Sequence, residues 1–145
     1  MLEDQKKYDL AEKYARQAIT LDPGRSSGYS AVARICVRQE WWKDLDSLLP
    51  QAEKNVPDDL APYFYAGREL LTAEKDPARA ERYFRKYLSQ EPEGHAPSLS
   101  RAHWRLGQAL EKQGRKPEGI SEIEMAVRLE PDFEGAKKDL KRLKQ

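Results

Sequence analysis

Six side chains in this sequence form three pairs that could bind an acidic or planar group. In each pair the two residues are four positions apart, so on a helix both would lie on one face. The pairs are Arg34 with Arg38, Phe64 with Arg68, and Arg101 with Arg105. A guanidinium can donate two parallel hydrogen bonds to a carboxylate and can stack on a flat ring. With Tyr65 and Trp104 in the same segments, these residues have the composition of a binding surface.

Catalytic chemistry finds little support in the same sequence. It contains no glycine-rich phosphate loop, no HExxH motif and no GxSxG motif. Acid–base or metal chemistry would have to use His95 and His103, and no third ligand or base lies at a suitable spacing from either. Adjacent carboxylates such as Asp58 and Asp59 are better explained as helix caps. We therefore expect no enzymatic activity, no cofactor and no metal site.

The composition is that of a domain with a large polar surface. The 145 residues are 39% hydrophobic and 35% charged, which suits an elongated array of repeats. Lys and Arg number 26 against 25 Asp and Glu, and a net charge of +1 predicts no general attraction to nucleic acid or membranes. No apolar run approaches the roughly 20 residues of a membrane span, so we expect a soluble chain of undetermined compartment. The single cysteine, Cys36, follows the apolar face of a helix and is expected to be a buried thiol.

An internal repeat predicts the elements that position these residues. Three columns of residues recur with the same successive steps of 34, 35 and 39 positions. The columns are Pro23, Pro57, Pro92 and Pro131; Ala11, Leu45, Ala80 and Gly119; and Ala18, Ala52, Tyr87 and Ala126. A period of this length is typical of stacked helix hairpins, and each full period holds two apolar stripes with helical spacing. No segment alternates like a β-strand, so the predicted fold is all-α.

Turn-forming residues predict where several helices begin and end. Gly114 follows one expected helix, where a left-handed residue is favoured, and Pro117 opens the next helix, where a missing N–H costs little. Asp76 is expected to cap a helix that has Pro77 in its first turn.

Two irregularities interrupt the regular pattern. Pro50 lies inside an expected helix, and we predict a kink or break near residues 48–51 because proline lacks an N–H. In the unit over residues 60–94, the distance from Gly67 to Ala80 is one residue longer than the corresponding distance in the neighbouring units. The extra residue is therefore expected in the turn around 74–76.

The repeat resembles the tetratricopeptide repeat over nearly the whole chain. The last unit carries an initial aromatic residue, a Leu-Gly pair, a helix-ending glycine, two small residues around an apolar one, and a final proline. These are His103–Trp104, Leu106–Gly107, Gly114, Gly119, Ile123, Ala126 and Pro131. The preceding units supply Tyr29, Val32–Ala33, Trp42, Leu49 and Ala52, and then Tyr63, Ala66–Gly67, Leu70, Ala80 and Phe84. Leu45 and Tyr87 depart from the pattern by occupying alanine positions.

This resemblance implies a right-handed superhelix of antiparallel helix hairpins. The single domain would comprise a partial repeat (1–25), three repeats (26–59, 60–94 and 100–133), an insertion between repeats (95–99) and a C-terminal capping helix (134–145). Because the first hairpin lacks most of one helix, we expect a fragment of a longer protein or a chain that pairs this end with another copy.

The first helices of such hairpins line a concave groove that binds peptides or partner helices in this family. The positions that carry over are Arg34, Arg38, Phe64, Tyr65, Arg68, Arg101, Trp104, Arg105 and Gln108. Some members use five groove residues to grip the C-terminal carboxylate of chaperone tails. The corresponding positions here are Ser30, Arg34, Tyr65, Arg101 and Arg105, and both asparagines of that clamp are absent. Chaperone-tail binding is therefore not supported, but a preference for acidic peptides is.

We predict a non-catalytic scaffold that binds a protein or peptide ligand, an acidic or carboxylate-bearing segment, in this groove. Phe64, Tyr65 and Trp104 would anchor the ligand, and the arginines would select acid groups. The alternative is a structural spacer or a self-association module that uses the incomplete N-terminal repeat. An RNA-binding helical repeat is less favoured, because the acidic residues Glu69 and Glu111 border the groove.

Overall fold

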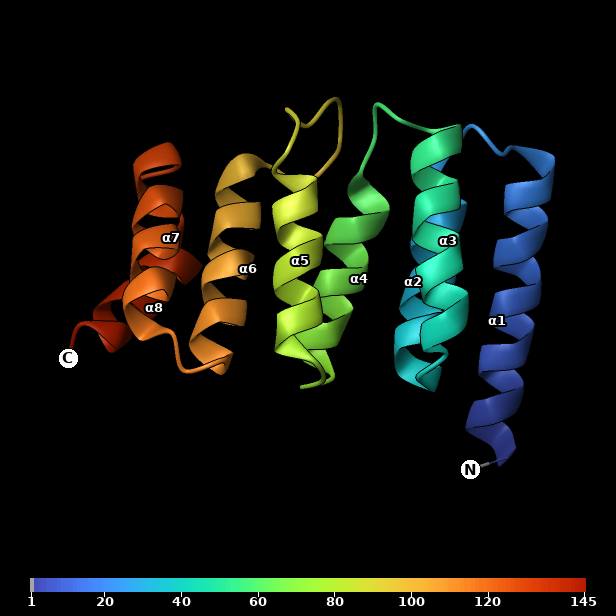
Figure 1. Ribbon diagram of the computed structural model, residues 1–145, viewed down its shortest axis with the longest axis horizontal. Helices are drawn as coiled ribbons and strands as arrows, with labels where there is room; N and C mark the ends of the chain where they lie inside the picture. The colour runs from blue at the N-terminus through green and yellow to red at the C-terminus, as the bar shows by residue number, and fades with distance from the viewer. Residues whose placement is uncertain (1) are drawn as a thin grey trace.

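The computed structural model describes the backbone of residues 2–145 and the side chains of residues 5–145. Over these residues the chain forms eight α-helices and no β-strand. The helices are α1 (Leu2–Leu21), α2 (Ser26–Gln39), α3 (Trp42–Asn55), α4 (Ala61–Thr72), α5 (Pro77–Tyr87), α6 (Leu99–Lys112), α7 (Lys116–Leu129) and α8 (Glu134–Leu143). Figure 1 shows them in one row that runs from α1 to α7 and α8. The all-α prediction is confirmed.

The helices pair as successive antiparallel hairpins. Helix α2 packs on α3, α4 on α5, and α6 on α7, and α1 and α8 pack on the two ends of this series. The first helices of the hairpins also contact one another, α2 with α4 and α4 with α6. This arrangement is the predicted array of helix hairpins, in which each unit touches only its neighbours.

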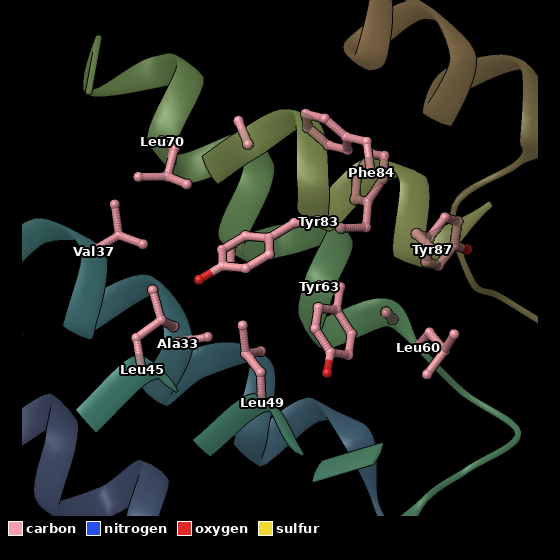
Figure 2. Close-up of a cluster of buried hydrophobic side chains, with 14 of the residues drawn as sticks. Ala33, Val37, Leu45, Leu49, Leu60, Tyr63, Leu70, Tyr83, Phe84 and Tyr87 are labelled. Carbon is pink, nitrogen blue, oxygen red and sulfur yellow. The ribbon is translucent and has the colours of Figure 1, made fainter. Parts of the chain in front are cut away.

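The predicted apolar stripes form the core between the helices. Leu45 and Leu49 of α3, Leu70 of α4 and Phe84 of α5 are between 0 and 2% exposed, and Figure 2 shows them gathered between the helices. Cys36 is also buried, as expected, and burial raises the pKa of its thiol to about 11. This thiol is therefore protonated and unreactive at neutral pH.

Small residues allow the paired helices to approach closely. A Cβ added to Gly67 of α4 would lie 2.8 Å from Cζ of Phe84 in α5. A Cβ added to Gly107 of α6 would lie 2.5 Å from Cγ1 of Ile123 and 2.9 Å from the carbonyl oxygen of Gly119, both in α7. The glycine positions of the repeat are therefore contacts between the two helices of a hairpin.

The predicted helix ends are confirmed at both turns. The Asp76 carboxylate accepts a hydrogen bond from the backbone N–H of Arg79 at 3.1 Å and caps α5. Gly114 has a φ of +78° between α6 and α7. In the turn that carries one extra residue, Glu74 and Asp76 both have positive φ, at 56° and 40°. The extra residue thus lies in a turn with two left-handed residues.

The predicted break at Pro50 does not occur. Helix α3 continues through this residue to Asn55. The Pro50 side chain is exposed, while Leu49 and Ala52 beside it are buried at 2% each. Packing on both sides of the proline holds the helix together despite the missing N–H.

Helix α1 has one buried and one uncovered side. Ala15 is buried where α1 packs on α2. On the other side Leu10, Tyr14 and Leu21 are 51%, 61% and 86% exposed. Residues 2–21 form α1 alone, so the described residues hold no second helix of this incomplete hairpin.

Helix α8 covers the last hairpin as the predicted capping helix. Phe133, directly before the helix, is buried together with Ala136 and Leu143, while most other side chains of α8 are charged. One side of α8 therefore packs on the array and the other faces solvent. No helix within residues 2–145 is long and apolar enough to cross a membrane.

Candidate binding groove

Two adjoining hollows lie along the layer formed by the first helices. The first, of 630 Å³, lies between α2, α4 and the loop at residues 88–98. The second, of 540 Å³, lies between α4, the same loop and α6. Tyr65 and Arg68 line both hollows, which therefore form one continuous surface that we call the groove. A third hollow, of 310 Å³, extends the groove past Arg105 to α8.

Most of the predicted site residues meet at this groove. Seven of the nine line it with exposed or half-buried side chains. They are Arg34 of α2, Tyr65 and Arg68 of α4, and Arg101, Trp104, Arg105 and Gln108 of α6. Residues more than 70 positions apart in the sequence thus share one surface because α2, α4 and α6 lie in one layer.

Phe64 lies in the core, and this position corrects its expected role as an exposed anchor. Its side chain is 3% exposed, and its ring centroid lies 5.6 Å from that of Phe84 and 5.4 Å from that of Tyr87. It borders the second hollow but offers almost no surface. Consecutive helix residues point about 100° apart, so Phe64 faces α5 while Tyr65 faces the groove.

Arg38 lies on α2 but outside the lining of the hollows. Its guanidinium forms an ion pair with the carboxylate of Glu69 on α4. This contact links the first helices of two repeats. Arg38 is therefore the one predicted arginine whose charge is already compensated by a neighbour.

The remaining four predicted arginines have no ion pair within the described part of the chain. Arg34, Arg68, Arg101 and Arg105 lie within 4.0 Å of no carboxylate oxygen, in contrast to arginines elsewhere such as Arg79. Their positive charges are therefore uncompensated along one surface.

Each of these four guanidiniums lies near an aromatic ring. The distances from the guanidinium carbon to the ring centroid are 6.0 Å for Arg34 and 4.8 Å for Arg68 over Tyr65, 4.9 Å for Arg101 over Phe133, and 4.3 Å for Arg105 over Trp104. A nearby ring attracts the cationic group without using its N–H donors, which stay available for hydrogen bonds. The rings therefore position the arginines before a ligand arrives.

The electrostatics of Arg105 reflect this crowding of positive charge. Burial lowers the pKa of Arg105, and the nearby charges of Arg68 and Arg101 lower it further, against an opposing effect of Asp139. Arginine nevertheless stays protonated under all ordinary conditions. An anion placed among these three side chains would relieve their mutual repulsion.

Trp104 both lines the groove and holds α8 in place. Its indole Nε1–H donates to Oδ2 of Asp139 at 2.7 Å, and its ring packs edge-on to Phe133 at a centroid distance of 4.9 Å. Gln108 donates to the same carboxylate oxygen at 3.1 Å. The ring can still contact a ligand, but its N–H is engaged.

The loop at residues 88–98 supplies a wall of the groove that the sequence did not assign to the site. His95, Ala96 and Pro97 line both large hollows. The hydroxyl of Tyr87, itself only 2% exposed, donates to the carbonyl oxygen of Pro97 at 2.5 Å. Two signals pointed to this wall, namely the five-residue insertion and the tyrosine in an alanine position.

Ser30 occupies the first position of the chaperone-tail clamp but does not resemble its lysine. Its side chain is buried at 7% exposure, and its Oγ has no hydrogen-bond partner within the described part of the chain. The long cationic group of that clamp is thus replaced by a short, buried hydroxyl.

The two histidines lie in different surroundings. Nδ1 of His103 lies 2.7 Å from Oε2 of Glu122, which joins α6 to α7. His95 belongs to the loop beside the groove. Among the described side chains, no three His, Cys, Asp or Glu residues are grouped closely enough to hold a metal ion.

Comparison with known families agrees with the hairpin array. Two family models of the tetratricopeptide repeat match the chain, over residues 64–132 and over residues 1–25. This chain belongs to the tetratricopeptide repeat family. A tetratricopeptide repeat protein is a scaffold for protein–protein interactions, and members are typically non-catalytic. No curated protein matches the sequence.

Solved tetratricopeptide repeat structures share the fold of this member. The thermophilic protein TTC0263 of Thermus thermophilus superposes with a TM-score of 0.70 at 14% identity, covering 97% of this chain and 74% of that one. MamA gives 0.66 at 13% identity, with coverages of 97% and 79%. YrrB, described as having an unusual peptide-binding site, gives 0.59 at 17% identity, with coverages of 98% and 70%. At these identities the likeness concerns the fold alone.

Proposed function

We propose that the groove binds an acidic segment of a partner protein, either an extended peptide or a helix. The observation that carries this proposal is the row of four uncompensated guanidiniums held against aromatic rings along α2, α4 and α6. Carboxylates on the segment would accept paired hydrogen bonds from the arginine edges. Tyr65 and Trp104 would contact the apolar parts of the segment.

Three carboxylates line the two large hollows, those of Asp59, Glu93 and Glu130, and hydrogen bonds within the described part of the chain engage two of them. Asp59 accepts hydrogen bonds from the Ser26 hydroxyl at 2.6 Å and from the backbone N–H of Ala61 at 2.9 Å. Glu130 accepts one from the Ser100 hydroxyl at 2.9 Å. These two acidic groups are engaged in holding helix ends, which supports a role for the arginines in binding a ligand from outside.

The test compares two pools of capped, fluorescently labelled peptides by fluorescence anisotropy. One pool is rich in Glu and Asp, and the other has Gln and Asn at the same positions. We expect the acidic pool to bind at least about tenfold more tightly, because charge-assisted hydrogen bonds are stronger than neutral ones. Equal binding of the two pools would contradict the proposal.

A charge-reversal variant tests whether the peptides bind in the groove. Arg68→Glu combined with Arg105→Glu should abolish binding of the acidic pool. The control combines Arg82→Glu with Arg128→Glu, which makes the same charge change at exposed positions on α5 and α7. If groove and control variants bind alike, the groove is not the site. Oligonucleotide binding that falls steeply with salt, together with weak peptide binding, would favour the nucleic-acid alternative.

Self-association through α1 is the second candidate function. The observation that favours it is the exposed apolar side formed by Leu10, Tyr14 and Leu21. A second copy could cover this side. Light scattering over a range of concentrations separates the candidates, since a strictly monomeric chain would exclude self-association and leave the groove proposal standing.

A further inference from the structure

The second hollow of the groove is lined by three of the four arginines that have no ion pair. Arg68 reaches it from α4, and Arg101 and Arg105 reach it from α6. The one carboxylate in its wall is Glu130, which already accepts a hydrogen bond from Ser100. Three guanidiniums therefore face a volume of 540 Å³ without a matching number of negative charges.

The three guanidiniums keep most of their hydrogen-bonding capacity. The guanidinium carbon of each lies 4.3 to 4.9 Å from a ring centroid, and a contact with a ring uses none of the N–H donors of the guanidinium. Arg105 donates from Nη1 to Oε1 of Gln108 at 3.1 Å. The side chains of Arg68 and Arg101 donate to no acceptor within the described part of the chain. The donors are therefore oriented but largely unsatisfied.

The beginning of α6 adds to this positive field. Ser98, the N-cap residue of α6, lines the second hollow, and its Oγ accepts from the backbone N–H of Arg101 at 3.3 Å. No acidic residue lies in the first turn of this 14-residue helix. The partial positive charge of a helix N-terminus thus acts on the same hollow as the arginines.

The loop at residues 88–98 forms one wall of the hollow. Residues 95–97 line it, and the hydrogen bond from Tyr87 to Pro97 ties the loop to α5. The hollow thus combines three cationic donors, a helix N-terminus and a fixed wall.

We infer that this hollow binds a phosphoryl group, carried as phosphoserine or phosphothreonine by the acidic partner segment. Such a group has a charge of about −1.5 to −2 and three acceptor oxygens. It can therefore accept hydrogen bonds from all three guanidiniums at once, whereas a carboxylate has one charge and two oxygens. This inference rests on the proposed function, since it names the group that the groove prefers.

The test uses capped peptides of alternating glutamate and alanine that differ only at the centre. One carries phosphoserine, the second two adjacent glutamates, and the third serine. Titration calorimetry should show the phosphoserine peptide binding about tenfold more tightly than the double-glutamate peptide. The double-glutamate peptide matches the added charge, so equal affinity for these two peptides would overturn the inference.

Substitutions of single arginines show which part of the groove is responsible for the preference for phosphoserine. Arg105→Gln should reduce the affinity ratio between the phosphoserine and double-glutamate peptides to about one. Arg34→Gln, in the first hollow only, should weaken all three peptides and leave this ratio unchanged. If Arg105→Gln impairs folding, Arg101→Gln replaces it, because that side chain is exposed. A ratio that survives substitution of Arg101 and Arg105 would also overturn the inference.

The two proposals can fail separately. Tight binding of the acidic peptide pool without a preference for phosphoserine would reject the phosphoryl site and leave the acidic-peptide function intact. Failure of all acidic peptides to bind, including the phosphoserine peptide, would reject both.

Discussion

At the scale of single residues, the contact between Gly107 and Gly119 sets how closely α6 and α7 approach. A Cβ at Gly107 would lie 2.9 Å from the carbonyl oxygen of Gly119, and a Cβ at Gly119 would lie 2.9 Å from that of Gly107. Both obstacles are backbone atoms, which cannot turn aside as a flexible side chain would. The hairpin is therefore sensitive to a single methyl group at either position.

Gly107→Ala is expected to destabilise the protein by about 1–3 kcal/mol through overpacking. The gain in helix propensity over glycine, about 1 kcal/mol, would offset only part of that cost. Denaturant unfolding followed by circular dichroism measures the change. Gly24→Ala is the control, because the nearest atom to its added Cβ is Oδ1 of Asp22 at 3.7 Å. Equal stability of the two variants would mean that α6 and α7 separate at little cost.

Phe64 and Tyr65 are adjacent in the sequence, yet one is a core residue and the other lines the groove. Both are aromatic residues in α4, and the sequence made both candidate anchors. Their burial differs because Phe64 points between α4 and α5, where it meets Phe84 and Tyr87. Residue type alone could not show that Phe64 belongs to the core and Tyr65 to the groove.

At the scale of elements, α3 shows that packing can outweigh a local preference. The pattern around Pro50 predicted a kink or a break, yet the helix is unbroken, with buried residues on both sides of the proline. Because proline has no N–H, one helical hydrogen bond is missing and the folded protein is less stable. A substitution of Pro50 can restore this hydrogen bond.

Pro50→Ala is expected to stabilise the protein by about 2 kcal/mol. It removes a proline penalty of about 3 kcal/mol in a helix interior, less about 0.4–1 kcal/mol from a more flexible unfolded chain. The control is Pro117→Ala in the first turn of α7, where no helical hydrogen bond is missing and no stabilisation is expected. Thermal and denaturant unfolding compare them, and an equal response of the two variants would show that Pro50 is not strained.

The loop at residues 88–98 is the element that changes the site most. The column spacing located its extra residues, but not the side of the array on which they lie. That position depends on Tyr87, whose hydroxyl holds Pro97 beside the groove. Gln90 in the same loop donates to the carbonyl oxygen of Pro57 at 3.0 Å, so side-chain hydrogen bonds hold the inserted loop against the array.

At the scale of the whole molecule, polar contacts join each repeat to the next. Among the described side chains, four ion pairs that involve arginine connect residues 31, 33, 34 and 31 positions apart, a distance close to one repeat. They are Arg38–Glu69, Arg79–Asp46, Arg115–Glu81 and Arg142–Glu111. Stability is therefore spread over contacts between neighbours, as in other repeat arrays. The end units, which have one neighbour each, depend most on single contacts.

Acid is expected to loosen the attachment of α8. Two hydrogen bonds from Arg142, at 2.7 and 3.0 Å, lower the pKa of Glu111 in the folded protein. A carboxylate with a lowered folded pKa stabilises the fold fully above its unfolded pKa, about 4.3, and this contribution disappears as the pH falls through the folded value. Because Arg142 is half-exposed, the effect should stay below about 1 kcal/mol.

Comparing variants isolates this pH effect. Between about pH 6 and pH 3, the free energy of unfolding of Glu111→Gln should fall less than that of the unaltered protein. Glu91→Gln, an exposed loop position without an ion pair in the described residues, should follow the unaltered protein. Hydrogen exchange of the α8 backbone amides, measured in the same three proteins, reports the local stability of this helix over the same pH range. A parallel fall in all three proteins would show that Glu111 does not contribute.

The sequence by itself determined the all-α array, its hairpins, its capping helix and most of the groove arginines. It could do so because repeat spacing and helical periodicity are local patterns that recur along the chain. Only the tertiary structure decided that Phe64 is buried, that Arg38 is paired with Glu69, and that the inserted loop forms a wall. It also decided that Arg68 meets Arg101 and Arg105 in one hollow. These outcomes depend on side-chain direction and on contacts between different repeats, and residue spacing along one chain does not specify either.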